Sequence, residues 1–277
     1  MGGYVKHRTV FFVSDRTGIT AETLGLSLIS QFENIHFTHV TLPFVDSVEK
    51  ALEAQKRIRE RLALDGAKPL IFATIVEPEI REILSDSGGC YNDFFRTFIP
   101  SLEQELDQPS NKAIGRIHGV RNTHVYDSRI DAVNFALNYD DGAKINNYKA
   151  ADLILLGVSR SGKTPTCLYL AMRYGIHAAN YPLTEEDLEL HGLPKFLVEH
   201  RKKLFGLTTD PKRLHKIRQG RKPNSRYATL SQCEQEVKAV EKLFIEENIP
   251  YLSSTDVSIE ELSSKILSIF GIERMIR

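Results

Sequence analysis

Residues 153–164, with the sequence LILLGVSRSGKT, decide the fold of this 277-residue chain. The run 153–156 is wholly apolar, which predicts a strand buried on both faces of a parallel sheet. Residues 157–164 satisfy the pattern G-x-x-x-x-G-K-[ST], and apolar residues then follow at helical spacing up to Tyr174. A strand that turns through such a loop into a helix indicates a phosphate-binding loop, or P-loop, in an α/β domain.

Each part of this loop has a chemical purpose. Gly157 and Gly162 let the backbone curl so that consecutive N–H groups point at phosphate oxygens, and the helix N-terminus adds partial positive charge. Lys163 is the expected catalytic cation at the terminal phosphates, and the Thr164 hydroxyl is the expected ligand of Mg²⁺. Arg160 is predicted to be a second catalytic group that braces a phosphate, with a solvent-exposed loop arginine as the alternative. The expected nucleotide-binding residues are Gly157, Val158, Ser159, Arg160, Ser161, Gly162, Lys163 and Thr164.

The composition is that of an ordinary globular protein. Lysine plus arginine and aspartate plus glutamate number 36 each, so the formal net charge is zero. Such a balance predicts neither nucleic acid nor an anionic membrane as a partner. No stretch approaches the roughly 20 apolar residues needed to span a bilayer. The three cysteines, Cys90, Cys167 and Cys233, are widely spaced, which favours reduced thiols and a cytoplasmic location.

Strands and helices alternate along the whole chain, which predicts an α/β fold. We expect an N-terminal α/β domain over residues 1–145, with a regulatory or partner-binding role. A C-terminal P-loop kinase-like domain with a mostly parallel sheet is expected over residues 146–277. The boundary is placed after the turn signal Asp140-Asp141-Gly142.

The pattern predicts individual elements in both halves. In the first half, we expect strands at 9–13, 36–42 and 69–76, and helices at 19–31, 48–64, 78–84 and 91–106, the last interrupted near Pro100. In the second half, we expect strands at 153–156, 176–181 and 203–207, and helices at 130–137, 166–174, 211–219, 229–247 and 258–271.

Four further groups of residues have two readings each. Residues 14–18, SDRTG, follow the first strand, where a ligand site or a helix N-cap is expected. Residues 126–129 and 140–142 offer a base or a metal ligand, with capping and turn formation as the alternative. His118 is a weaker candidate for a functional residue, with an ordinary loop histidine as the alternative. The basic run 212–222 is expected to be a solvated helix face, with a surface for a phosphorylated partner as the alternative.

Several long motifs carry a resemblance to a known family. GVSRSGKTPTCLYLA, AANYPL, FGLTTDPKRL and NSRYATL follow one another in the second half, and SDRTGITAE and YDSRIDAVNFAL precede them. In this order the motifs resemble the phosphoenolpyruvate synthase regulatory proteins, within the broader pyruvate, phosphate dikinase regulatory protein family. The resemblance runs from about Val10 to the C-terminus. One departure is Tyr139, because the family usually has histidine before Asp-Asp-Gly.

The resemblance implies a bifunctional enzyme. One activity would be an ADP-dependent kinase that phosphorylates a threonine of phosphoenolpyruvate synthase and inactivates it. The other would remove that phosphate with inorganic phosphate as acceptor, giving pyrophosphate. ADP, inorganic phosphate and pyrophosphate are then the co-substrates, with Mg²⁺ beside them, and the family's nucleotide-binding segment maps onto residues 157–164. A homodimer is left open.

Other functions remain compatible with the same loop. The intact Gly162-Lys163 pair resembles the synthase-regulating branch, and the same chemistry on pyruvate, phosphate dikinase is the alternative. An ATP-using kinase of small molecules and a nucleotide-dependent switch without catalysis are two further hypotheses. Neither the general base nor the target threonine is assigned from the sequence.

Overall fold

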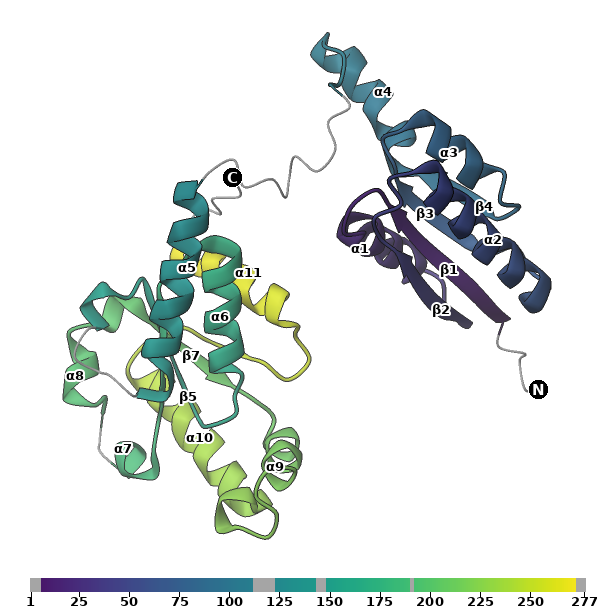
Figure 1. Ribbon diagram of the computed structural model, residues 1–277. Coiled ribbons are helices and arrows are strands. Elements are labelled where there is room, and N and C mark those ends of the chain that lie inside the picture. The colour runs from purple at the N-terminus through teal and green to yellow at the C-terminus, as the bar shows by residue number, and fades with distance from the viewer. Residues whose placement is uncertain (1–5, 112–122, 143–147, 190–191, 273–277) are drawn as a thin grey trace. The chain divides into compact units, whose positions relative to one another are not determined.

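The computed structural model describes residues 6–111, 123–142, 148–189 and 192–272. The chain divides into two compact units, residues 1–119 and 120–277, and each is an α/β unit built on one four-stranded sheet (Figure 1). All strand pairs in both sheets are parallel. The predicted α/β fold class is therefore confirmed.

The first unit has the strand order β2-β1-β3-β4. Its strands are β1 (Lys6–Ser14), β2 (Ile35–Leu42), β3 (Leu70–Thr74) and β4 (Cys90–Asp93), and its helices are α1 (Ile19–Ile29), α2 (Val48–Asp65), α3 (Pro78–Ser85) and α4 (Phe94–Leu106). Strand β1 is buried on both faces. Phe11 packs with residues of α2 and α3, whereas Phe12 packs with residues of α1 and α4.

The start and the middle of α4 differ from the expectation of one interrupted helix over 91–106. Residues Cys90–Asp93 instead form a fourth strand that pairs with β3. Helix α4 begins after this strand because the Asp93 carboxylate accepts a hydrogen bond from Arg96 N at 2.9 Å, which caps the helix. The helix then continues through Pro100, so the predicted interruption is wrong.

The second unit has the strand order β6-β5-β7-β8, the same second-first-third-fourth order as the first unit. Its strands are β5 (Leu153–Gly157), β6 (Ala178–Pro182), β7 (Leu204–Thr208) and β8 (Tyr251–Ser253). Its helices are α5 (Thr123–Asn138), α6 (Lys163–Tyr174), α7 (Glu185–Glu189), α8 (Lys195–Val198), α9 (Pro211–Gln219), α10 (Leu230–Glu246) and α11 (Ile259–Phe270). Short 3₁₀ turns in the described part of this unit span Asp140–Gly142, Tyr148–Ala150, Arg201–Lys203 and Arg226–Ala228.

The alternating side chains of β5 place helices on both faces of this sheet. Leu153 and Leu155 are buried with residues of α5, α6 and α11, whereas Ile154 and Leu156 are buried with residues of α10 (Figure 1). Strand β5 lies between β6 and β7 in the sheet. These are the next two strands of the chain, and they pair with opposite edges of β5. Its carboxyl end is therefore the point where the strand order reverses, and α/β sheets bind ligands at this point.

The two compact units divide between residues 119 and 120, rather than between 145 and 146 as expected from the turn at residues 140–142. The reason is α5, which belongs to the second unit. Ala132 and Ala136 of this helix are buried in the same cluster as Leu170 and Ala171 of α6.

Within the described residues, no helix combines the length and the apolar character needed to cross a bilayer. All three cysteines are free thiols, with Cys90 exposed and the other two buried.

Candidate functional site

The loop between β5 and α6 is curled, and its backbone conformation explains its glycines. Gly157 has a φ of 153°, and a Cβ atom at this residue would lie 2.2 Å from the Leu207 carbonyl oxygen of β7. Gly162 has a φ of 92°, and Arg160 a φ of 77°, so both adopt the left-handed conformation. Only glycine fits at residue 157, because the backbone carbonyl of Leu207 lies too close to leave room for a Cβ atom.

The N–H groups of this curled loop are largely without acceptors. Ser161 N donates to the Val158 carbonyl at 3.3 Å. No hydrogen bond within the described part of the chain uses the N–H groups of Ser159, Arg160, Gly162, Lys163 or Thr164. The Ser161 hydroxyl is buried and has no partner among the described residues either. Unpaired donors at the start of a 12-residue helix fit a bound phosphate, whose oxygens are the acceptors they lack.

Lys163 supplies the positive charge of the loop. Its side chain is buried, and Nζ donates to the carbonyl oxygen of Val158 at 2.9 Å. Burial lowers the pKa of Lys163 to about 8, while the nearby charges of Asp141 and Asp140 oppose this effect. The ammonium group is therefore mostly protonated at neutral pH and lies inside the loop.

Thr164 lies beside the carboxylate of Asp140, which is 24 residues earlier in the sequence. The Thr164 hydroxyl donates to Asp140 Oδ1 at 2.7 Å, and the Asn180 amide of β6 donates to the same oxygen. Asn180 Oδ1 in turn accepts a hydrogen bond from Asp141 N at 3.1 Å. A hydroxyl and a carboxylate in contact are the hard oxygen ligands that Mg²⁺ prefers near phosphates, so these residues fit the expected metal.

Asp140 and Asp141 are residues for which the sequence left a turn and a ligand role open. The structure shows both a 3₁₀ turn and a contact with the loop. The sequence signal D-D-G identified the turn. The contact with Thr164, 24 residues away, is a consequence of how α5 packs on α6, which no local pattern reveals.

A buried arginine supports the loop from the side of α9 and α10. Arg218 is completely buried, and its Nη2 donates to the carbonyl oxygen of Ser159 at 3.1 Å and to Glu236 Oε2 at 2.7 Å. Its guanidinium group lies over the Tyr227 ring, 4.0 Å from the ring centre. The Tyr227 hydroxyl also donates to Ser159 Oγ at 2.9 Å.

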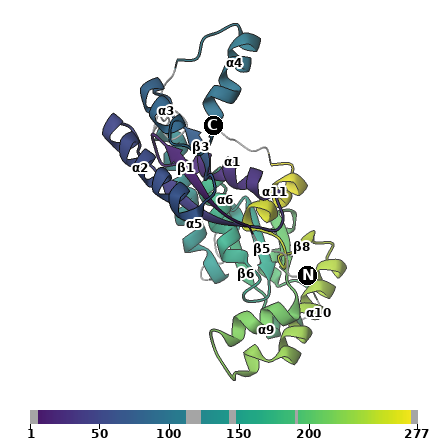
Figure 2. The same cartoon turned by 90° about the vertical axis from the view of Figure 1, so that its right-hand side faces the viewer.

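The expectation of a solvated basic face over residues 212–222 is therefore wrong for Arg218. The other basic residues of this run are exposed, as expected. Leu214 and Arg218 are four residues apart on α9 and are the two buried residues of that helix. This spacing is the signal that could have identified Arg218, because residues i and i+4 share one helix face. Helices α9 and α10 lie side by side in both views (Figure 1 and Figure 2).

The remaining candidate residues make no contact within the described part of the chain that supports their predicted roles. Arg160 is exposed and has no hydrogen bond or ion pair within the described residues, so its predicted role as a clamp stays a prediction. Asp15 does not cap α1, whose N-cap is Gly18 without a side-chain hydrogen bond. It accepts a hydrogen bond from Val76 N at 2.9 Å, and burial raises its pKa. His118 lies outside the described residues.

Residues 126–129 lie on α5, and the hydrogen bonds that reach Thr164 and Asn180 involve Asp140 and Asp141 instead. The predicted nucleotide-binding segment, residues 157–164, runs from the last residue of β5 through the curled loop to the first turn of α6.

Comparisons with known proteins identify relatives that match over nearly the whole chain. The profile of the "Kinase/pyrophosphorylase" family matches residues 10–267. A relative from Ectopseudomonas mendocina (strain ymp) is 56% identical over 270 residues, covering 98% of this chain and 99% of its own. A relative from Pseudomonas fluorescens (strain Pf0-1) is 57% identical over 267 residues, covering 96% and 98%. Both carry the name "Putative phosphoenolpyruvate synthase regulatory protein". The chain therefore belongs to the kinase/pyrophosphorylase family.

Proposed function

We propose that this protein is a bifunctional serine/threonine kinase and phosphorylase that regulates phosphoenolpyruvate synthase. In one direction it would transfer the β-phosphate of ADP to a threonine of the synthase and inactivate the enzyme. In the other it would transfer that phosphate to inorganic phosphate, which releases pyrophosphate and reactivates the synthase. The family and the names of the relatives support the target, and the loop supports the chemistry.

The observation that carries the proposal is the set of unpaired N–H groups around the buried ammonium of Lys163. Such a loop binds phosphate oxygens and does not read the rest of the molecule. ADP, pyrophosphate and orthophosphate can therefore occupy the same cradle in turn. Because ADP has one phosphate fewer than ATP, its β-phosphate must occupy the place where Lys163 reaches the transferred group.

The kinase direction breaks the bond between the β-phosphorus and the oxygen that bridges the two phosphates. The threonine hydroxyl oxygen forms the new bond to the β-phosphorus, and AMP leaves. The hydroxyl proton needs an acceptor, and we assign this role to Asp141, an exposed carboxylate whose charge acts on Lys163. In the reverse direction, an oxygen of inorganic phosphate forms a bond to the phosphorus of the phosphothreonine, and the bond from that phosphorus to the threonine oxygen breaks. The threonine oxygen takes the proton that the attacking phosphate gives up, and pyrophosphate leaves.

Thr164 and Asp140 would hold Mg²⁺, which neutralises charge on the phosphates when bound. Asn180 keeps Asp140 in place through its hydrogen bond to the same carboxylate oxygen. Arg160 is a candidate second clamp because its exposed guanidinium is attached to the loop itself. Catalysis then depends on positioning and on charge, as expected for phosphoryl transfer.

The test uses the purified protein with phosphoenolpyruvate synthase, supplied in turn with ADP, ATP and inorganic phosphate. We expect phosphothreonine in the synthase with ADP, detected by mass spectrometry, and pyrophosphate release from the phosphorylated synthase with inorganic phosphate. Transfer from ATP alone, with ADP inert, would falsify the proposal. Unchanged phosphothreonine would indicate a binding switch instead, and turnover of a free metabolite would indicate a small-molecule kinase. The same assays with pyruvate, phosphate dikinase in place of the synthase show which of the two enzymes is the target.

The variant Lys163→Ala supplies the internal control. It should lower both reactions by about 10²-fold or more, since it removes the cation that faces the transferred group. Survival of the phosphate-dependent reaction in this variant would show that the two activities use separate sites.

A further inference from the structure

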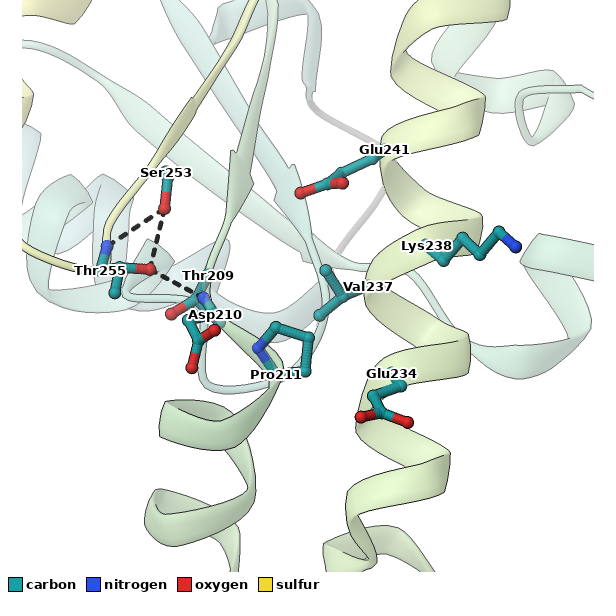
Figure 3. Close-up of a pocket in the computed structure, with 9 residues that line it drawn as sticks. All are labelled: Thr209, Asp210, Pro211, Glu234, Val237, Lys238, Glu241, Ser253 and Thr255. Atoms are coloured by element: carbon teal, nitrogen blue, oxygen red, sulfur yellow. Dashed lines mark hydrogen bonds between the residues drawn. The ribbon is translucent and has the colours of Figure 1, made fainter.

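A cavity lies at the same edge of the sheet as the loop of residues 157–164. Its volume is about 420 Å³, within the usual range for small-molecule sites. Figure 3 shows that its walls are the segment 209–211 after β7, the end of β8 with Ser253 and the following Thr255, and one face of α10. The proposed chemistry uses no residue of this cavity.

The cavity and the phosphate loop share a wall. Ser254 lies between the two wall residues Ser253 and Thr255, and its hydroxyl donates to the carbonyl oxygen of Ser161 at 2.9 Å. The same hydroxyl lies 3.2 Å from the carbonyl oxygen of Thr208, at the end of β7. The cavity therefore lies next to the loop, with Ser254 between them.

The charge of the cavity excludes a second polyphosphate. Asp210, Glu234 and Glu241 contribute three carboxylates, against the single cation of Lys238. Asp210 caps α9 through Arg213 N, and Glu241 accepts a hydrogen bond from the Thr208 hydroxyl. Glu234 is exposed and has no partner within the described residues. Such acceptors suit a neutral group that donates hydrogen bonds.

The cavity also offers apolar surface. Val237 is 5% exposed on the side of α10, and the ring of Pro211 faces the cavity from the other wall in Figure 3. A nucleoside combines the two properties needed, because its base has apolar faces and its ribose and amino groups are donors. A bound orthophosphate or pyrophosphate has neither.

We infer that this cavity receives the nucleoside part of a nucleoside diphosphate whose phosphates lie in the loop of residues 157–164. The inference rests on the proposed function and adds that the two reactions use different parts of the site. The kinase reaction uses both the loop and the cavity, whereas the phosphate-dependent reaction uses the loop alone. A change in the cavity should therefore separate the two activities, which share the same loop.

The test is Glu234→Trp, which places a large side chain in the cavity from an exposed helix position. Gln235→Trp is the matched control, because Gln235 is the next exposed residue of α10 and does not line the cavity. Calorimetry measures the binding of ADP and of pyrophosphate to each protein. For Glu234→Trp we expect about tenfold weaker ADP binding or more, with pyrophosphate binding and the phosphate-dependent reaction unchanged. Gln235→Trp should match the wild type in ADP binding, in pyrophosphate binding and in the phosphate-dependent reaction.

Equal loss of ADP and pyrophosphate binding in Glu234→Trp, or no loss of either, would overturn the inference. A second variant, Val237→Phe, fills the cavity from its apolar side, and its thermal unfolding shows whether it is folded. Wild-type protein that binds ADP and pyrophosphate but phosphorylates no protein would remove the proposed function and leave the cavity assignment standing.

Discussion

Arg218 donates a hydrogen bond to the backbone carbonyl of Ser159, 59 residues earlier in the chain, and so connects α9 to the loop of residues 157–164. The same guanidinium is paired with Glu236, and both groups are largely removed from water. A buried arginine at this place therefore has two effects that can be measured apart, one on stability and one on the shape of the loop.

We predict that Arg218→Met lowers the free energy of unfolding by about 3–5 kcal/mol, because it leaves the Glu236 carboxylate buried without its partner. The double variant Arg218→Met with Glu236→Met should recover most of that loss, since no charge is left unpaired. Both variants lack the hydrogen bond to Ser159, so both should bind pyrophosphate more weakly than the wild type. Chemical denaturation measures the free energy of unfolding, and calorimetry measures the binding of pyrophosphate. Full recovery of pyrophosphate binding in the double variant would show that Arg218 acts on stability alone.

The binding of pyrophosphate should depend on pH through Lys163. Burial lowers the pKa of this lysine to about 8, and its charged form is the one that attracts phosphate. Below pH 8 the group is already protonated. Above pH 8 binding must take up a proton, so the association constant should fall by up to about tenfold per pH unit.

Lys163→Arg keeps its charge over this whole range and is the matched control. The measurement is calorimetry between pH 6.5 and 9.5 without divalent cations. A similar decline in the arginine variant would assign the pH dependence to another group.

Asp140 and Asp141 are adjacent and are predicted to have different roles. Asp140→Asn removes the charge that faces Thr164, so we expect Mg²⁺ to lose most of its effect on ADP binding and both reactions to slow by about 10²-fold. Asp141→Asn should keep the effect of Mg²⁺ on ADP binding and slow the kinase reaction by about 10²-fold. ADP titrations with and without Mg²⁺, together with rates, separate the pair. Identical behaviour of the two variants would refute this assignment.

The two glycines of the loop should respond differently to alanine. At Gly157 the new methyl group would meet the backbone of Leu207, so Gly157→Ala should lower stability by about 3 kcal/mol. At Gly162 the nearest atoms are those of Ser254 at 3.8 Å, so only the left-handed backbone is strained, with an expected loss of about 1 kcal/mol. Thermal unfolding of both variants provides the comparison. A larger loss at Gly162 than at Gly157 would contradict this account of the loop.

Local patterns predicted those parts of the fold that depend on neighbouring residues. The capping residues Thr229 and Ser258 start α10 and α11 as expected, because each side chain accepts a hydrogen bond from the N–H three residues later. The strand, loop and helix around residues 153–164 also follow from apolar content and glycine alone.

Contacts between distant residues account for what the sequence did not reveal. Strands β4 and β8 are four and three residues long and carry no apolar run, so they are recognisable only from their pairing with β3 and β7. Asp140 reaches Thr164, and Arg218 reaches Ser159, through helix packing. The two sheets share one strand order, but the sequence shows no internal repeat that would predict it.

Each sheet of the protein has its own apolar clusters. Among the described residues, those of the first sheet lie within residues 10–94 and those of the second within residues 132–272. Each half therefore buries its own apolar surface and has its own source of cooperativity. Heating the protein in a calorimeter should give two overlapping transitions, and saturating pyrophosphate should raise the melting temperature of one of them and leave the other where it was.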